Sequence, residues 1–186
     1  MKMDLYGDGI GSVELIDHMG SDLAVVNAAR VSFGKHKDVI DDNDKKLIKY
    51  LIKNHHTSPF EHCSITFRFS VPLLVRSQHH RHRTWSFNEI SRRYTEENLE
   101  FYEPNAFRTQ SENNRQASNE DELINPVMWT RDEGGENLQF VASTIVKEHH
   151  KNCVNLYNRL LEEGVCREQA RGVLPQNLYT QYYRNS

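Results

Sequence analysis

Long apolar runs, paired cysteines and a strong net charge are all missing from this chain of 186 residues. No apolar run approaches the ~20 residues that span a bilayer, so no transmembrane helix is predicted. The three cysteines, Cys63, Cys153 and Cys166, lack the CxxC spacing of zinc and redox motifs, and each is expected to be a single buried or half-buried thiol. The net charge of -3 disfavours a protein that coats nucleic acid, so any bound anion needs a local basic cluster.

The composition is typical of one folded domain over residues 1–186. With 37% hydrophobic and 26% charged residues, a chain of this length buries roughly two thirds of its unfolded surface without a metal or disulfide. The first residues, MKMDLYGDG, lack a cationic region followed by a hydrophobic stretch. We therefore expect an unprocessed, cytoplasmic protein with no membrane or nucleic-acid partner.

Hydrophobic periodicity predicts both strands and helices. Alternation predicts a short strand over residues 1–6 and a half-buried strand over residues 64–71. The glycines at 7, 9 and 11 lack the full GxGxxG spacing, which favours a turn over a dinucleotide-binding loop. Apolar residues recurring at three and four positions predict helices over residues 22–29, 44–54, 73–80, 138–160 and 167–174. The apolar stripe of the second helix is Leu47, Ile48, Leu51 and Ile52.

Two further segments have no clear period. Residues 96–135 are crowded with Asn, Gln, Glu and Ser, which predicts a long surface loop or flap. Residues 178–186 carry Tyr179, Tyr182 and Tyr183 at the end of the sequence. We expect these rings to be covered by a neighbouring subunit, or by an element that would follow.

Histidines and arginines cluster in the middle of the chain. Six of the ten histidines lie between positions 55 and 82, namely His55, His56, His62, His79, His80 and His82. Five arginines accompany them, namely Arg76, Arg81, Arg83, Arg92 and Arg93. Imidazoles are common metal ligands, but neighbouring histidines point apart on a helix and guanidinium groups repel a dication, so no metal site is predicted. Guanidinium groups remain charged and form forked bonds to phosphate, which favours an anion site over a solvated basic face.

Polar and aromatic residues are interleaved with these arginines. Gln78, Ser86, Asn88, Glu89 and Ser91 supply donors and acceptors of the kind that bind a base or a flavin edge. Trp85 and Phe87 offer a flat apolar wall, although core packing accounts for at least one of them.

The run RHRTWSFNEIS at residues 81–91, followed by Arg92, Arg93 and Tyr94, resembles the signature of the flavin-dependent thymidylate synthases. That signature is an Arg-His-Arg and a Ser separated by seven residues. Three further blocks are similar to the family: HTSPFEH at 56–62, FYEPNAFRTQSENNRQAS at 101–118 and REQARGVLPQNLYT at 167–180. The likeness covers almost the whole chain, and the insert at 119–135 matches least.

The resemblance implies an enzyme that reductively methylates dUMP to dTMP. In this family methylenetetrahydrofolate donates the carbon, NADPH is the reductant and FAD carries the hydride. The implied fold is α+β, a single domain with a mixed sheet packed with helices. The implied assembly is a homotetramer whose active sites are shared between subunits.

The resemblance also implies roles for individual residues. The dUMP-binding positions are Gln78, Arg81, Glu89, Ile90, Ser91, Arg92, Arg93 and Arg171. The FAD-binding positions are Ser58, Arg81, His82, Arg83 and Glu89. His56 aligns with a pocket histidine that helps to place folate or reductant, and its alternative role is that of a capping or core residue. Arg92 replaces a family glycine, so it either crowds the site or adds a phosphate contact.

Family members continue beyond the Asn-Leu-Tyr-Thr block into a segment with flavin contacts and an arginine that acts on the uracil. Arg184 lies too close to that block to be this arginine. We therefore expect this chain to have weak synthase activity, or none, when alone. The alternatives are a non-catalytic flavin or nucleotide binder, and a histidine-rich metalloenzyme that would purify with stoichiometric metal.

Overall fold

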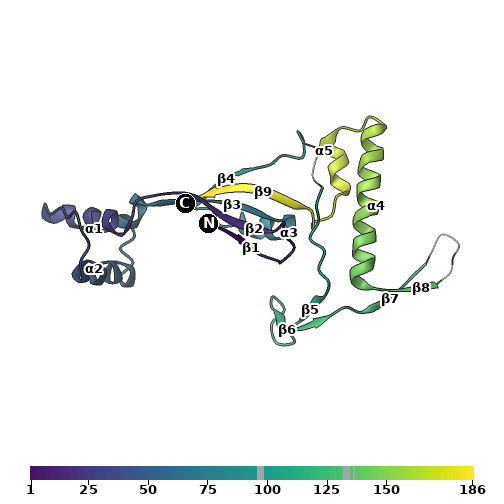
Figure 1. The fold of residues 1–186 in the computed structure, drawn as a ribbon, viewed down its shortest axis with the longest axis horizontal. Helices are drawn as coiled ribbons and strands as arrows, with labels where there is room; N and C mark the ends of the chain where they lie inside the picture. Colours follow the sequence, from purple (N-terminus) through teal and green to yellow (C-terminus); the bar gives the residue numbers. More distant parts are fainter. Residues whose placement is uncertain (96–98, 132–134, 136) are drawn as a thin grey trace. The chain divides into compact units, whose positions relative to one another are not determined.

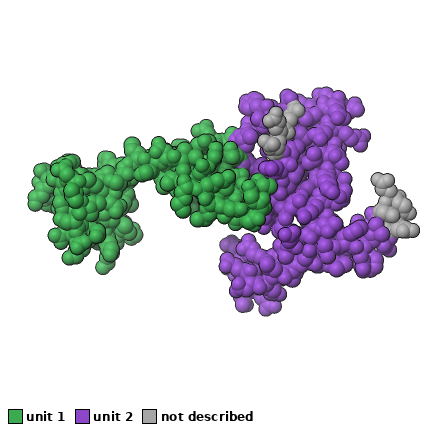
Figure 2. Space-filling model, in the orientation of Figure 1, with its two compact units in different colours: residues 1–70, 78–89, 181–186 green, residues 71–77, 90–180 purple. Residues whose placement is uncertain are grey.

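A computed structural model describes residues 1–95, 99–131, 135 and 137–186. These residues form two compact units, which Figure 2 shows in separate colours. Unit 1 comprises Met1–Ser70, Gln78–Glu89 and Gln181–Ser186, and unit 2 comprises Val71–Ser77 and Ile90–Thr180. Each unit combines segments that are far apart in the sequence.

An antiparallel sheet, most of which lies in unit 1, has the strand order β1-β2-β3-β9-β4 (Figure 1). In that order the strands are Lys2–Asp4, Ser12–Met19, Ser64–Pro72, Tyr179–Asn185 and Ser86–Glu89. The pairs β1–β2, β2–β3 and β4–β9 are antiparallel. Between β3 and β9, Thr66 bonds to Asn185 while Phe69 stacks on Tyr182, so these strands also run in opposite directions. The strands predicted at residues 1–6 and 64–71 are confirmed, whereas among the described residues the expected mixed sheet is antiparallel.

Two helices, α1 (Asp22–Arg30) and α2 (Asp42–Lys53), pack together in unit 1. Their predicted positions are confirmed. Asp41 and Asp44 form a capping box at the start of α2, which satisfies backbone amides that the helix leaves without partners. The predicted stripe is only partly correct, because Leu51 is buried while Ile52 is 59% exposed. Short 3-10 turns follow at Val31–Phe33 (η1) and Ser58–His62 (η2).

Unit 2 is built around the long helix α4 (Ala142–Glu162). It ends before Gly164, whose φ of 84° suits a residue without a Cβ, as the sequence predicted. The short helix α5 (Arg167–Ala170) and the 3-10 turn η3 (Arg171–Val173) follow. The core is the cluster of Tyr157, Ala170, Leu174 and Leu178. The helix predicted after Pro72 is also present, as α3 (Leu73–His79).

The long loop predicted at residues 96–135 is wrong. Two antiparallel hairpins form instead, β5 with β6 and β7 with β8. Their strands are Phe107–Gln110, Ser118–Ile124, Val127–Arg131 and Asn137–Val141. Both faces of β7 and β8 are largely exposed, so these strands lack the alternation that marks a half-buried strand. Residues 96–98 and 132–134 of the predicted loop lie outside the described residues.

The tyrosines near the end of the sequence are covered differently from the expectation. Tyr179 and Tyr182 are both buried, and Tyr182 is 1% exposed within this chain alone. Tyr183 points to the other face of β9 from Tyr182 and is 42% exposed. Neither a second subunit nor a further element is needed to bury the rings of Tyr179 and Tyr182.

None of the described helices has both the length and the apolar character required to cross a bilayer.

Candidate functional site

The charged part of the signature forms an exposed turn in unit 1. Residues 80–85, which we call the arginine turn, link α3 to β4. The backbone amides of Arg81 and His82 donate hydrogen bonds to the carbonyls of Gln78 (3.1 Å) and His79 (3.3 Å). The side chains of Arg81, His82 and Arg83 are exposed. Permanently charged, accessible guanidinium groups on one tight turn are suited to hold an anion.

The arginine turn is supported by a cluster of rings on the sheet. This ring cluster consists of Phe69, His79, His80, Phe87 and Tyr182. Its tightest contact places the His80 ring 4.1 Å from that of Phe87. Tyr182 stacks on Phe69 at 5.4 Å and meets His80 edge-on at 4.8 Å. Aromatic rings at these distances and angles attract one another beyond simple burial.

His79 is neutral at physiological pH. Burial lowers its pKa to about 4, and the positive charge of Arg184 and the neighbouring His82 and His80 contribute to the same shift. A hydrogen bond of 2.6 Å joins its Nδ1 to the Tyr182 hydroxyl. The uncharged imidazole thus links the end of α3 to β9 of the sheet.

Arg184, in β9, is buried beneath the arginine turn. Its guanidinium carbon lies 3.6 Å from the centre of the Trp85 ring and 5.5 Å from that of Phe87. The strand register sets this arrangement, because Phe87 in β4 pairs with Arg184 in β9. Burial lowers the pKa of this arginine. From the sequence alone, Arg184 was excluded from the uracil-binding role and had no other.

Unit 2 brings together two of the arginines expected to bind dUMP. Arg93 approaches the Glu168 carboxylate at 3.9 Å. Arg171 donates from Nε to the Glu168 backbone carbonyl at 3.3 Å. Ser91 lies beside this pair, since its Oγ accepts a hydrogen bond from the Arg93 amide at 3.3 Å. Arg93 and Glu168 are both half-exposed, so their pairing is weak and a phosphate can compete for the arginine.

Arg92 points elsewhere. Its Nη2 donates to the Tyr179 carbonyl at 3.5 Å, and burial lowers its pKa, opposed by the nearby Tyr157 and Glu100. Arg92 is therefore half-buried against the core of unit 2. Its contact with dUMP stays a prediction.

Comparison with known proteins shows the family of the chain. The family model described as "Thymidylate synthase complementing protein" (Thy1) matches residues 14–185. The chain belongs to this family. The resemblance carried by the signature is thereby confirmed.

Curated relatives of this Thy1 chain are named flavin-dependent thymidylate synthases. The chain is 43% identical over 173 residues to the one from Thermus thermophilus, covering 93% of this chain and 58% of the relative. It is 41% identical to the one from Wolbachia pipientis wMel, covering 93% of this chain and 57% of the relative. The chain therefore spans under three fifths of the length of these relatives.

A solved structure is similar to this Thy1 chain over almost its full length. It is the UMP/dUMP methylase PolB from Streptomyces cacaoi bound with 5-Br dUMP, with a TM-score of 0.73 and 33% identity. The match covers 98% of this chain and 75% of that one.

Within this Thy1 chain, the predicted site residues fall into separate groups. The structure gathers Gln78, Arg81, His82, Arg83 and Glu89 around the ring cluster of unit 1, and Ser91, Arg93 and Arg171 around Glu168 of unit 2. Ile90 opens the unit 2 segment and is exposed. Ser58 begins η2, and His56 meets Tyr50 edge-on at 6.0 Å. In the part of the chain that the structure describes, neither contacts the arginine turn.

Sequence reasoning missed three residues that lie beside the predicted site residues. His79 was considered only within the histidine cluster, Tyr182 only as an uncovered ring, and Glu168 not at all. The signal for Tyr182 was alternation, because Tyr182 and Arg184 share the inward face of β9. No pattern in the sequence pointed to Glu168.

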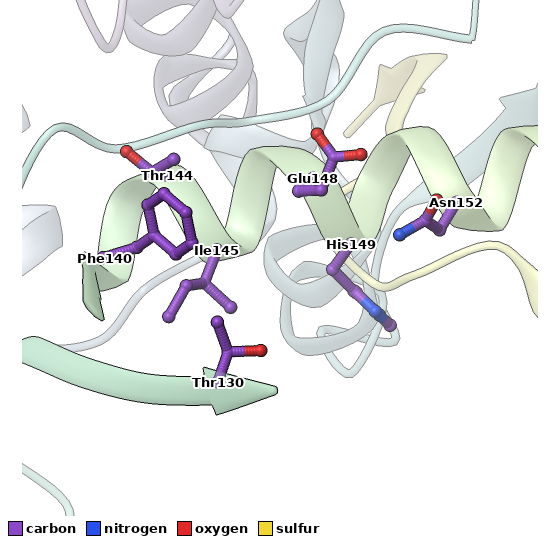
Figure 3. A pocket seen from close by; sticks show the side chains of 7 residues that line it. All are labelled: Thr130, Phe140, Thr144, Ile145, Glu148, His149 and Asn152. Carbon is purple, nitrogen blue, oxygen red and sulfur yellow. The ribbon is translucent and has the colours of Figure 1, made fainter. Parts of the chain in front are cut away.

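The histidine cluster does not converge on a metal. Among the described residues, no group of three or more His, Cys, Asp or Glu side chains is placed to hold a metal ion. An open pocket of about 390 Å³ lies elsewhere in unit 2 (Figure 3). Phe140 and Ile145 are its apolar lining residues, and Thr130, Thr144, Glu148, His149 and Asn152 complete the lining.

Proposed function

We propose that this chain serves the reductive methylation of dUMP to dTMP, with methylenetetrahydrofolate as carbon donor, NADPH as reductant and FAD as hydride carrier. The names of its relatives support the reaction, and PolB, bound with 5-Br dUMP, supports a pyrimidine nucleotide as substrate. The observation that carries the proposal is the meeting of Arg93 and Arg171 at Glu168. Two guanidinium groups with one loosely held carboxylate leave positive charge available for a phosphate dianion.

The phosphate of dUMP would bind to the unit 2 group. Arg93 and Arg171 supply the charge, and Ser91 adds a neutral hydroxyl donor once its oxygen is fixed by the Arg93 amide. Gln78, Arg81, Glu89 and Ile90 belong to the nucleotide side by family resemblance. Ser91 has no histidine or carboxylate in hydrogen-bond contact among the described residues, so it is assigned to binding rather than nucleophilic attack.

The arginine turn would hold FAD. The exposed donors of Arg81, His82 and Arg83 fit a cofactor that carries a diphosphate, and Glu89 and Ser58 complete the predicted set. When bound, the flavin supplies hydride transfer. The residues of this chain bind and orient it, and the turn presents their charges with the backbone already fixed.

Three finer features belong to the same proposal. His56 would help to place the folate or the reductant. The chain would act as a single cytoplasmic domain over residues 1–186 and assemble as a homotetramer whose subunits share active sites.

Binding and turnover measurements test the proposal. Calorimetry with dUMP and fluorescence quenching of FAD are made on the wild-type chain and on Arg93→Met, Arg171→Met and Arg159→Met. Arg159 is an exposed arginine of α4 and serves as the matched control. We expect the first two substitutions to weaken dUMP binding at least about tenfold, since each removes charged hydrogen bonds, and the control to leave it unchanged.

Formation of dTMP with FAD, NADPH and methylenetetrahydrofolate then separates an enzyme from a binder. Turnover establishes the synthase, whereas tight binding of dUMP and FAD without turnover establishes the non-catalytic relative. A wild-type chain that binds neither compound, or that purifies with stoichiometric metal, would contradict the proposal.

A further inference from the structure

Arg184 is a buried cation whose partners are aromatic. It is 4% exposed, and its Nε has no hydrogen-bond partner among the described residues. In the same described part of the chain, no carboxylate pairs with its guanidinium. Its guanidinium carbon lies over the Trp85 ring, 3.6 Å from the ring centre.

Burying an arginine in this way costs stability. Removing a charge from water without an ion-pair partner is unfavourable, and the attraction between a cation and an indole face offsets part of that loss. An apolar residue on the inward face of β9 would avoid the penalty altogether. The flat guanidinium covers the indole in a way that neither a methylene chain nor an ammonium group reproduces.

The two ends of the arginine turn are held on the same pair of strands. At the start of the turn, the His80 ring packs on Phe87 of β4 and Tyr182 of β9. At the end of the turn, the Trp85 ring stacks against the guanidinium of Arg184 in β9. Arg81, His82 and Arg83 are displayed between these two attachments. The stack of Trp85 and Arg184 is thus the attachment next to Arg83.

We propose that Arg184 is a positioning residue that holds the arginine turn, through Trp85, in the conformation that binds the phosphate-bearing cofactor. The inference rests on the proposed function, because it assigns the cofactor to that turn. Arg184 itself does not touch the ligand. Loosening its stack lets Trp85 and the adjacent Arg83 move, which weakens binding at the turn while the Arg93 and Arg171 pair of unit 2 stays intact.

Affinity measurements on the full chain provide the first test. We expect Arg184→Met and Trp85→Leu each to raise the Kd for FAD about five- to tenfold, and the double variant to be no weaker than either single one. Trp85→Phe should retain most of the affinity, because a ring remains under the guanidinium. Arg184→Lys should recover little, because an ammonium keeps the charge but loses the flat stack. In the Arg184 variants the Kd for dUMP should rise less than the Kd for FAD, since Arg93 and Arg171 of unit 2 keep their charge.

Arg68→Met is the matched control. Arg68 lies in β3 of the same sheet and pairs with Glu14 rather than with Trp85. Its loss lowers stability without disturbing the turn, so its Kd for FAD should stay at the wild-type value. Equal losses of FAD affinity in Arg68→Met and Arg184→Met would reduce Arg184 to a stabilising residue and overturn the inference.

Fluorescence gives a readout that does not depend on the cofactor. The chain has two tryptophans, so Trp129→Phe leaves Trp85 as the only reporter. In that background, Arg184→Met should increase acrylamide quenching of Trp85 about twofold or more, because the guanidinium no longer covers the indole. If the wild-type protein binds no FAD, the proposed function fails. In that case only the quenching of Trp85 tests the inference about Arg184. Unchanged quenching, full rescue by Arg184→Lys, or additive effects of the two single variants would each refute it.

Discussion

The hydroxyl of Tyr182 and Nδ1 of His79 are joined by a hydrogen bond of 2.6 Å between β9 and the end of α3. Because burial holds the pKa of His79 at about 4, the imidazole in this bond is uncharged at neutral pH. The bond ties the residue before the arginine turn to the strand that also carries Arg184. Tyr182 and Arg184, on the inward face of β9, therefore both support the arginine turn.

The first prediction concerns the pH dependence of stability. An unfolded histidine titrates near ~6.5, whereas His79 in the folded chain has a pKa of about 4. Between these values the unfolded chain binds the extra proton, so this histidine lowers stability as the pH falls from ~6.5 towards ~4. Chemical denaturation across this range should show a shallower slope in His79→Gln than in wild type. His36→Gln, at an exposed position, is the control for the loss of a histidine.

The second prediction concerns the buried carboxylate of α2. Asp44 is 0% exposed, and its two oxygens accept hydrogen bonds from Arg30 and Lys37, each at 2.6 Å. These contacts hold its pKa well below the ordinary value, with the Lys37 bond the largest cause. Asp44→Asn should lower the midpoint of thermal unfolding by several degrees, because it leaves Arg30 and Lys37 without their partner.

The same carboxylate, Asp44, makes the stability of the chain sensitive to acid. Since the folded pKa of Asp44 is depressed, its stabilising effect is complete above the unfolded value of ~3.9 and is lost as the pH falls below it. Asp42→Asn is the control, because Asp42 is exposed and pairs with Lys45 at the surface. Equal thermal midpoints for Asp44→Asn and Asp42→Asn would show that the buried network of Asp44 does not stabilise the fold.

The sequence predicted the helices of unit 1 and the strand at residues 64–71 from their hydrophobic periodicity. It predicted the strand at residues 1–6 from a short alternation, although Lys2–Asp4 is exposed throughout. It missed β7 and β8, where Val127 and Trp129 are 61% and 68% exposed and no burial pattern exists to detect. The sequence signature identified the arginine turn, but it did not identify the residues that support the turn. Arg184 and Tyr182 reach it through strand pairing across about a hundred residues, and neither spacing nor composition encodes such a register.

The third prediction separates the two roles left open for Arg92. Its guanidinium is half-buried and bonded to the Tyr179 carbonyl, so we expect a structural role. Arg92→Gly restores the family residue and should lower the thermal midpoint, while the Kd for dUMP changes less than about threefold. Arg93→Met should show the reverse pattern. A loss of dUMP affinity in Arg92→Gly as large as that in Arg93→Met would instead place Arg92 on the phosphate.

The fourth prediction is a gain of affinity. The Glu168 carboxylate lies 3.9 Å from Arg93 and competes with a phosphate for that guanidinium. Because a half-exposed ion pair is worth at most about 1 kcal/mol, Glu168→Gln should tighten dUMP binding about two- to fivefold, measured by calorimetry at low salt. Glu162→Gln, at the end of α4, is the control and should have no effect. The gain should shrink as salt is raised, since the ions screen the carboxylate that the substitution removes. A weaker dUMP complex in Glu168→Gln would mean that the carboxylate orients Arg93 rather than competing for it.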